Sequence, residues 1–128
     1  MDRFNINEGN FKSLQQELRF KIGEQYELNE FNLKSIESTL QNGIEYENYE
    51  YIKGDLKALF GIEFTSNIVL QYNGDILSKV VYEFHQKHYN YLYSKIKNYG
   101  INETILEVFI KDENICQIAL KKNLEAHF

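Results

Sequence analysis

The 128-residue chain contains no proline and no tryptophan, a single cysteine and only two arginines. The lone Cys116 excludes an internal disulfide framework and is typical of proteins in a reducing compartment. With Arg3 and Arg19 alone, the chain has no arginine cluster to bind phosphate groups. It has no run of 18 apolar residues, so no membrane-spanning helix is expected. Its first residues show no secretory signal, and we therefore expect a cytoplasmic protein.

The composition is that of a globular domain, with 43% hydrophobic, 15% aromatic and 26% charged residues. No stretch rich in proline, glycine or serine marks a linker. We therefore expect one domain over residues 1–123. Residues 124–128 begin with Leu124-Glu125 and resemble a cloning remnant, so we expect them to be a disordered tail or such a remnant.

Apolar side chains recur at helical spacing in the first half of the chain. This spacing predicts helices over residues 8–22, 29–41 and 46–60, and each segment is followed within two residues by a glycine. The first half of the chain is therefore expected to be helical.

The periodicity changes in the second half. Residues 62–72 alternate apolar and polar side chains, which predicts a half-buried strand. Residues 75–100 return to helical spacing and predict one long helix. Residues 104–111 and 115–122 alternate again, and a turn at 112–114 would join them as a hairpin. The whole pattern predicts an α+β fold, in which three N-terminal helices precede a β-α-β-β order and a small antiparallel sheet packs on the long helix.

Negative charge is concentrated in one segment of the chain. The net charge is -5, from 19 acidic and 14 basic residues. Residues 24–50 hold seven glutamates against Lys34 alone. Such a segment repels phosphate backbones and anionic membranes and attracts basic surfaces. We therefore expect neither a direct nucleic-acid partner nor a membrane partner, the alternative being a solvated face that only aids solubility.

Within this segment, residues 44–52 carry three glutamates, three tyrosines and no basic residue. On the expected helix, Tyr46, Tyr49 and Tyr51 would spread over about 180°, so at least one would be exposed. An exposed tyrosine beside carboxylates is an effective interface anchor, and the carboxylates steer a basic partner toward it. In the alternative, Tyr49 and Ile52 belong to the core and the glutamates only face water.

The sequence contains no defensible catalytic motif. His85 and His88 are three residues apart, but a metal site needs at least a third ligand, so we expect no metal and no cofactor. A minimal acid–base enzyme would use one of these histidines with Glu83 and would require a strongly shifted pKa in a cleft. Cys116 lies on the apolar face of an expected strand and is interpreted as a buried hydrophobe. We therefore expect that the protein is not an enzyme.

The leading hypothesis is a non-enzymatic binding module, an acidic inhibitor that docks on a basic protein. In size, acidity and lack of catalytic motifs, the chain resembles the immunity proteins of bacterial nuclease toxins and the small phage inhibitors of host defence nucleases. That resemblance implies toxin neutralisation and a nuclease-like partner. The residues predicted to bind the partner are Glu45, Tyr46, Glu47, Glu50 and Tyr51, with Glu24, Glu27 and Glu30 as the outer field.

The alternative hypothesis is a small-molecule binding or sensor domain. An aromatic pocket between the long helix and the sheet would hold the ligand, and tyrosine hydroxyls would orient it. The residues expected to line this pocket are Phe64, Tyr72, Phe84, His88, Tyr91 and Phe109.

Overall fold

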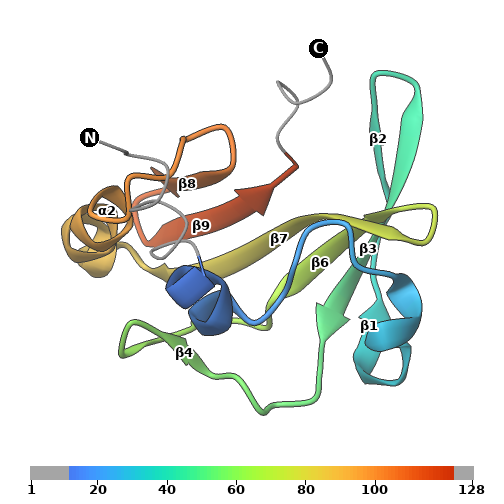
Figure 1. The fold of residues 1–128 in the computed structure, drawn as a ribbon, viewed down its shortest axis with the longest axis horizontal. Coiled ribbons are helices and arrows are strands. Elements are labelled where there is room, and N and C mark those ends of the chain that lie inside the picture. The colour runs from blue at the N-terminus through green and yellow to red at the C-terminus, as the bar shows by residue number, and fades with distance from the viewer. Residues whose placement is uncertain (1–11, 123–128) are drawn as a thin grey trace.

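The computed structural model describes residues 12–122, and these are dominated by a seven-stranded antiparallel sheet (Figure 1). The strand order is β1-β3-β6-β7-β9-β8, and β2 pairs with the remaining length of β3. The strands of this sheet are β1 (Leu33–Ser35), β2 (Thr39–Gln41), β3 (Ile44–Tyr51), β6 (Val69–Asn73), β7 (Ile76–His85), β8 (Leu106–Ile110) and β9 (Ile115–Lys121). A separate two-stranded hairpin consists of β4 (Ala58–Leu59) and β5 (Ile62–Glu63).

Helical structure is limited to short elements in the described residues. A helix covers residues 12–18, and α2 (Tyr89–Lys97) follows β7 after a 3-10 turn, η3 (Gln86–His88). Two further 3-10 turns, η1 (Tyr26–Leu28) and η2 (Glu30–Asn32), precede β1.

Tight turns with glycine connect the central strands. Asn42 and Gly43, with φ of +52° and +80°, join β2 to β3 directly, since Gln41 pairs with Ile44. Positive φ at both central residues is the geometry of a type I′ hairpin, which Asn-Gly favours. The β6–β7 hairpin also has a two-residue turn, Gly74 and Asp75, in which only Gly74 has a positive φ, of +63°.

One face of the sheet builds the core. Its side chains are fully buried, among them Tyr72 on β6, Tyr82 and Phe84 on β7, and Ile118 on β9. The helix over residues 12–18 packs on this inner face, and the Tyr82 hydroxyl donates a 2.7 Å hydrogen bond to the Leu18 carbonyl. The opposite, outer face carries the alternate side chains of the same strands, most of which are half-buried or exposed.

The expected α+β fold, with three N-terminal helices before a β-α-β-β order and a small sheet packed on one long helix, is wrong, because a seven-stranded antiparallel sheet dominates the described residues. The segments 29–41 and 46–60, predicted as helices, form η2, β1, β2 and β3 instead, followed by a loop and β4. Of the predicted helix 8–22, residues 12–18 are helical and residues 19–22 are not, while residues 8–11 lie outside the described part. Near the end of β3, Tyr49 and Tyr51 both pack against the core, and this spacing of two residues is that of one face of a strand.

The long helix predicted over residues 75–100 is also wrong for its first half, which is β7. A β-bulge explains the misleading spacing: the register with β6 shifts at Ser78, so Leu77 and Val80 are three residues apart yet both face the core. That spacing imitates a helical repeat. Only the second half of the segment is helical, as α2, in which Leu92 and Ile96 are buried.

The C-terminal half of the prediction is closer to the structure. The strands expected over residues 104–111 and 115–122 are confirmed as β8 and β9, which pair antiparallel. The strand expected over 62–72 divides into β5 and β6, with an irregular segment between them. The expected tail at 124–128 lies outside the described residues.

Candidate functional site

The acidic residues of segment 24–50 gather at one end of the molecule. We define the acidic end as η1, η2, β1 and β3 with their connecting residues, which lie together on the right of Figure 1. Ion pairs within residues 12–122 involve Asp55, Glu83 and Glu107, and none involves a glutamate of the acidic end. Its glutamates are Glu24, Glu27, Glu30, Glu37, Glu45, Glu47 and Glu50.

The strand conformation of β3 divides the segment that the sequence singled out. Glu45 and Glu47 project from one face of the strand, and Tyr46 and Glu50 from the other, because successive side chains alternate. Glu50 is half-buried, whereas Glu45 and Glu47 are exposed. Glu45 also accepts a 3.0 Å hydrogen bond from the Ser38 hydroxyl. The five residues expected at the centre of the interface therefore do not share one face.

The outer-field glutamates lie on and before the two 3-10 turns. Glu27 is exposed and Glu30 is half-buried. Glu24 is half-buried and accepts hydrogen bonds from the Asn29 side chain at 2.9 Å and from the Lys21 amide at 3.0 Å. Both donors are neutral amides, and the Glu24 carboxylate forms no ion pair with a cationic side chain among the described residues.

Tyr51 belongs to the core rather than to the surface. Its side chain is 5% exposed, and its hydroxyl donates a 2.8 Å hydrogen bond to Asp55, which also binds Arg19 at 2.6 Å. Burial and the bond to Asp55 raise the pKa of Tyr51 to about 12. Arg19 and then Tyr51 lower the pKa of the Asp55 carboxyl to about 2. This cluster anchors the end of the first helix to the end of β3.

Tyr49 is also part of the packed interior. Its ring lies 5.4 Å from that of Tyr26 and 5.7 Å from that of Tyr72. Burial raises the pKa of the Tyr49 hydroxyl, and the nearby Glu47 adds to the effect. Of the three tyrosines in the segment, Tyr46 is the one directed to the outer face, where it is half-buried.

Exposed apolar side chains accompany the glutamates of the acidic end. Phe31 is 91% exposed, Leu40 74% and Leu28 69%. The helix predicted over residues 29–41 would place Phe31 and Leu40 on its apolar stripe, so that prediction does not identify them as surface residues. The signal available was the Asn42-Gly43 pair, which predicts a short hairpin with no room for such a helix.

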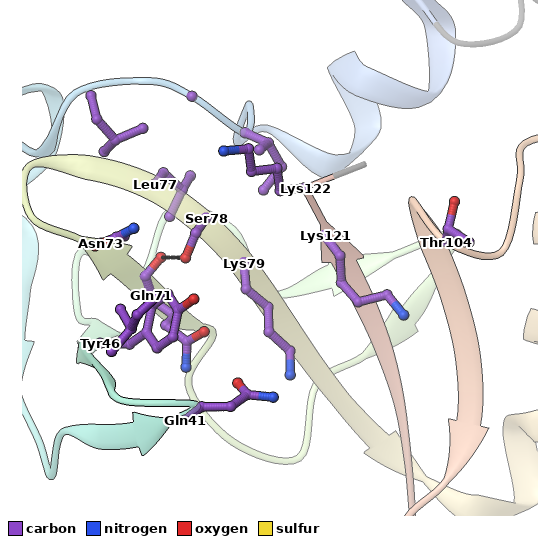
Figure 2. A pocket seen from close by; sticks show the side chains of 14 residues that line it. Gln41, Tyr46, Gln71, Asn73, Leu77, Ser78, Lys79, Thr104, Lys121 and Lys122 are labelled. Atoms are coloured by element: carbon purple, nitrogen blue, oxygen red, sulfur yellow. Dashed lines mark hydrogen bonds between the residues drawn. The ribbon is translucent and has the colours of Figure 1, made fainter. Parts of the chain in front are cut away.

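A second feature, absent from the sequence predictions, is a groove of about 970 Å³ along the outer side of the sheet. Figure 2 shows side chains from β3, β6, β7 and β9 around it, with Lys79 and Lys121 extending along the same side of the sheet. Its described lining contains three lysines and no carboxylate. The lining residues are Ile22, Gly23, Gln41, Ile44, Tyr46, Gln71, Asn73, Ile76, Leu77, Ser78, Lys79, Thr104, Lys121 and Lys122.

The aromatic residues of the alternative hypothesis do not converge on one pocket. Tyr72 and Phe84 are fully buried in the core. Phe109 pairs with Gln117, which in turn pairs with Glu83, so its side chain lies on the face of the sheet opposite to Tyr72 and Phe84. The Tyr91 hydroxyl instead donates to the Phe60 carbonyl at 3.2 Å.

His85, Glu83 and Cys116 make contacts within the fold. The exposed His85 accepts a 3.0 Å hydrogen bond from the Lys87 amide through Nδ1, which caps η3. Glu83 accepts hydrogen bonds from Gln117 Nε2 at 3.0 Å and from the hydroxyls of Thr65 and Ser66 in the segment before β6. Cys116 is fully buried, and burial raises the pKa of its thiol. Within the described part of the chain, no three His, Cys, Asp or Glu side chains are grouped to hold a metal ion.

Comparison with known proteins gives no relationship for this chain. No protein-family model matches it, and no curated protein or solved structure shows a significant match. Among residues 12–122, none of the helices has the length and apolar character needed to cross a membrane.

Proposed function

We propose that this chain is a non-enzymatic binding module whose acidic end docks on a basic protein of the nuclease type. The observation that carries the proposal is that exposed apolar and acidic side chains alternate on the same short elements. Phe31 and Leu28, the former 91% exposed, are interleaved with Glu27 and Glu30 over five residues. None of these carboxylates has a cationic partner among the described residues.

Each half of this arrangement has a physical role in association. An exposed phenylalanine loses a large hydrated area on docking and makes a strong anchor. Unpaired carboxylates around it accelerate encounter with a cationic surface and disfavour anionic ones. A nuclease cleft is a suitable target because it must be positive to hold phosphates, and an acidic surface can occupy it in their place.

The structure modifies which residues we assign to the interface. Tyr51 is buried and Glu50 is half-buried on the outer face, so we propose Phe31, Leu28 and Leu40 as the anchors. The exposed Glu27, Glu37, Glu45 and Glu47 supply the charge around them.

The test begins with capture of partners by the immobilised full chain at low and at high salt, followed by direct binding of each purified candidate. We expect a basic protein that the chain binds directly and whose nucleic-acid cleavage it blocks. The variant carrying Glu27→Lys, Glu37→Lys and Glu47→Lys should lose this binding. Its control, with Glu63→Lys, Glu103→Lys and Glu113→Lys, makes the same charge change at exposed positions outside the acidic end and should retain it. A direct partner that is acidic, or equal loss in both triple variants, contradicts the proposal.

A further inference from the structure

A pair of lysines occupies the middle of the outer-face groove. Lys79 on β7 and Lys121 on β9 are register partners, and both are half-buried on the same face of the sheet. Side chains directly opposite each other on neighbouring strands lie close together, and like charges at such positions are destabilising. Lys121 forms a partly exposed ion pair with Glu107, with 2.8 Å between Nζ and Oε1. Lys79 has no carboxylate partner among the described residues.

The groove also contains polar groups with unused hydrogen-bonding capacity. The Gln71 side chain is held in place because its Nε2 donates to Asn48 Oδ1 at 3.0 Å. The Ser78 hydroxyl donates to the Gln71 carbonyl at 3.1 Å, as the dashed line in Figure 2 shows. The side chain of Gln41 and the hydroxyl of Tyr46 make no hydrogen bond within residues 12–122, although both line the groove. Gln71 and Ser78 are therefore held in place by hydrogen bonds, whereas the polar groups of Gln41 and Tyr46 can bond to a ligand.

The wall formed by the β2–β3 hairpin is aromatic and apolar. Tyr46 and Ile44 come from β3, and Ile76 from the start of β7 faces the same groove. A flat ring can pack on a tyrosine face with an energy beyond that of simple burial. The volume of about 970 Å³ lies within the range usual for small-molecule sites.

We infer that this groove binds a small organic phosphate that carries a flat ring, the chemistry of a nucleoside monophosphate. The phosphate, with nearly two negative charges at neutral pH, fits two adjacent lysines better than a singly charged carboxylate does. Lysine acts as a point charge for phosphate, whereas a planar carboxylate is matched best by arginine, which the groove lacks. The ring would lie against Tyr46.

The number of phosphates distinguishes a free mononucleotide from a nucleic-acid strand as the ligand of this groove. The hairpin that forms the aromatic wall belongs to the acidic end, and the surplus negative charge of that end opposes the further phosphates of a strand. A mononucleotide presents a single phosphate, which Lys79 can bind without a competing carboxylate among the described residues and Lys121 in competition with Glu107. The groove is therefore assigned to the small ligand. This inference is independent of the docking function, since Lys79 and Lys121 are not part of the acidic end.

The experiment is calorimetric titration of the full chain with the four ribonucleoside monophosphates, with the matching nucleosides and inorganic phosphate as separate arms. We expect at least one monophosphate to bind saturably, and its nucleoside and inorganic phosphate to bind about tenfold more weakly or not at all. Absence of binding by all four, or equal binding of inorganic phosphate, overturns the assignment. A single-stranded oligonucleotide that binds more tightly than the mononucleotide overturns the small-ligand part of it.

Two variants locate the binding. Lys79→Gln should weaken the monophosphate about tenfold and raise the melting temperature of the ligand-free protein, because it removes a like-charge contact. The control Lys95→Gln, at an exposed position on α2, should change neither value. Unchanged affinity in Lys79→Gln contradicts the assignment.

Replacement of Tyr46 tests the ring contact. Tyr46→Phe keeps the ring and should keep the affinity, whereas Tyr46→Leu should weaken the monophosphate and leave inorganic phosphate unaffected. Equal affinity in both variants would overturn the proposed place of the ring.

Discussion

The side chains of Asn48 and Gln71 are hydrogen-bonded across β3 and β6, with 3.0 Å between Gln71 Nε2 and Asn48 Oδ1. Asn48 Nδ2 donates in turn to the Glu37 carbonyl at 2.9 Å and to the Thr39 hydroxyl at 2.7 Å. One buried amide thus connects the sheet, the β1–β2 connection and the edge of the groove.

Loss of this amide should destabilise the fold. We expect Asn48→Ala to reduce the free energy of unfolding by about 1–3 kcal/mol, because partners in a partly buried site lose their bonds. Urea unfolding measures the change. The control Asn90→Ala, at an exposed position on α2, should stay within about 0.5 kcal/mol of wild type. A similar small change in Asn48→Ala would mean that the network contributes little.

The turn at Asn42-Gly43 should be sensitive to replacement of the glycine, because its backbone has a positive φ. Gly43 has a φ of +80°, so Gly43→Ala should destabilise the protein by about 1–2 kcal/mol. Asn42→Gly keeps the same turn and should be close to neutral. Urea unfolding of both variants distinguishes strain at this turn from a general effect of substitution, which would make the two alike.

Buried tyrosines should make the fold sensitive to alkali. Burial raises the pKa of Tyr72 to about 12, and its hydroxyl has no hydrogen-bond partner among the described residues. The pKa of tyrosine in the unfolded chain is near its ordinary value of 10.0. The contribution of neutral Tyr72 to stability is therefore fully present below pH 10.0 and is lost as the pH rises toward 12. The loss for one such group is about 1.4 kcal/mol per pH unit.

Tyr72→Phe removes both the ionisation and the unpartnered hydroxyl. We expect this variant to lose less stability than wild type between pH 10 and 12, and to be at least as stable at pH 7. Denaturant unfolding at several pH values provides the measurement. An alkaline slope identical to that of wild type would show that Tyr72 ionises freely in the folded state.

Protonation of Asp55 should contribute to the loss of folding stability at acidic pH. The Arg19 guanidinium, and after it the Tyr51 hydroxyl, lower its pKa from 3.8 to about 2. Its contribution to stability is therefore present above pH 3.8 and is lost as the pH falls toward 2. Asp55→Asn should flatten the loss of stability in this interval, whereas Asp75→Asn, in an exposed turn, should not. Titration of the Asp55 carboxyl by NMR at an ordinary pKa would contradict this expectation.

Phe31 should matter for binding and not for folding. Because the side chain is 91% exposed, Phe31→Ala should change the free energy of unfolding by less than about 0.5 kcal/mol. Binding of the basic partner should weaken about tenfold or more, as for a central aromatic anchor. Ile110→Ala, at a partly exposed position outside the acidic end, is the control and should leave binding unchanged. Full affinity in Phe31→Ala would remove Phe31 from the interface.

The sequence predicts the C-terminal hairpin well and the rest of the sheet poorly, for local reasons. The core-facing residues of β8 and β9 are spaced by two, so the strand period is visible in the sequence; they are Leu106, Val108, Cys116, Ile118 and Leu120. In β7, the bulge at Ser78 breaks the alternation and produces a spacing that resembles a helix. In β3, Tyr49 and Ile52 have helical spacing by coincidence, since Tyr49 faces the core and Ile52 is 51% exposed beyond the strand.

The acidic part of the candidate site could be predicted from the sequence. The positions of the seven glutamates in the sequence are sufficient, because they fall within residues 24–50 and the elements that carry them lie together in the fold. The groove was not predictable in this way. Lys79 and Lys121 lie far apart in sequence and meet only through the register of β7 with β9.

The dependence of partner affinity on ionic strength tests the acidic end most directly. For the wild-type chain and its purified basic partner, the docking account predicts a dissociation constant that rises steeply with salt. It also predicts that Glu27→Lys, Glu37→Lys and Glu47→Lys together weaken binding and flatten this slope, while Glu63→Lys, Glu103→Lys and Glu113→Lys together change neither. A wild-type affinity independent of salt, or the same slope in both triple variants, would contradict the account.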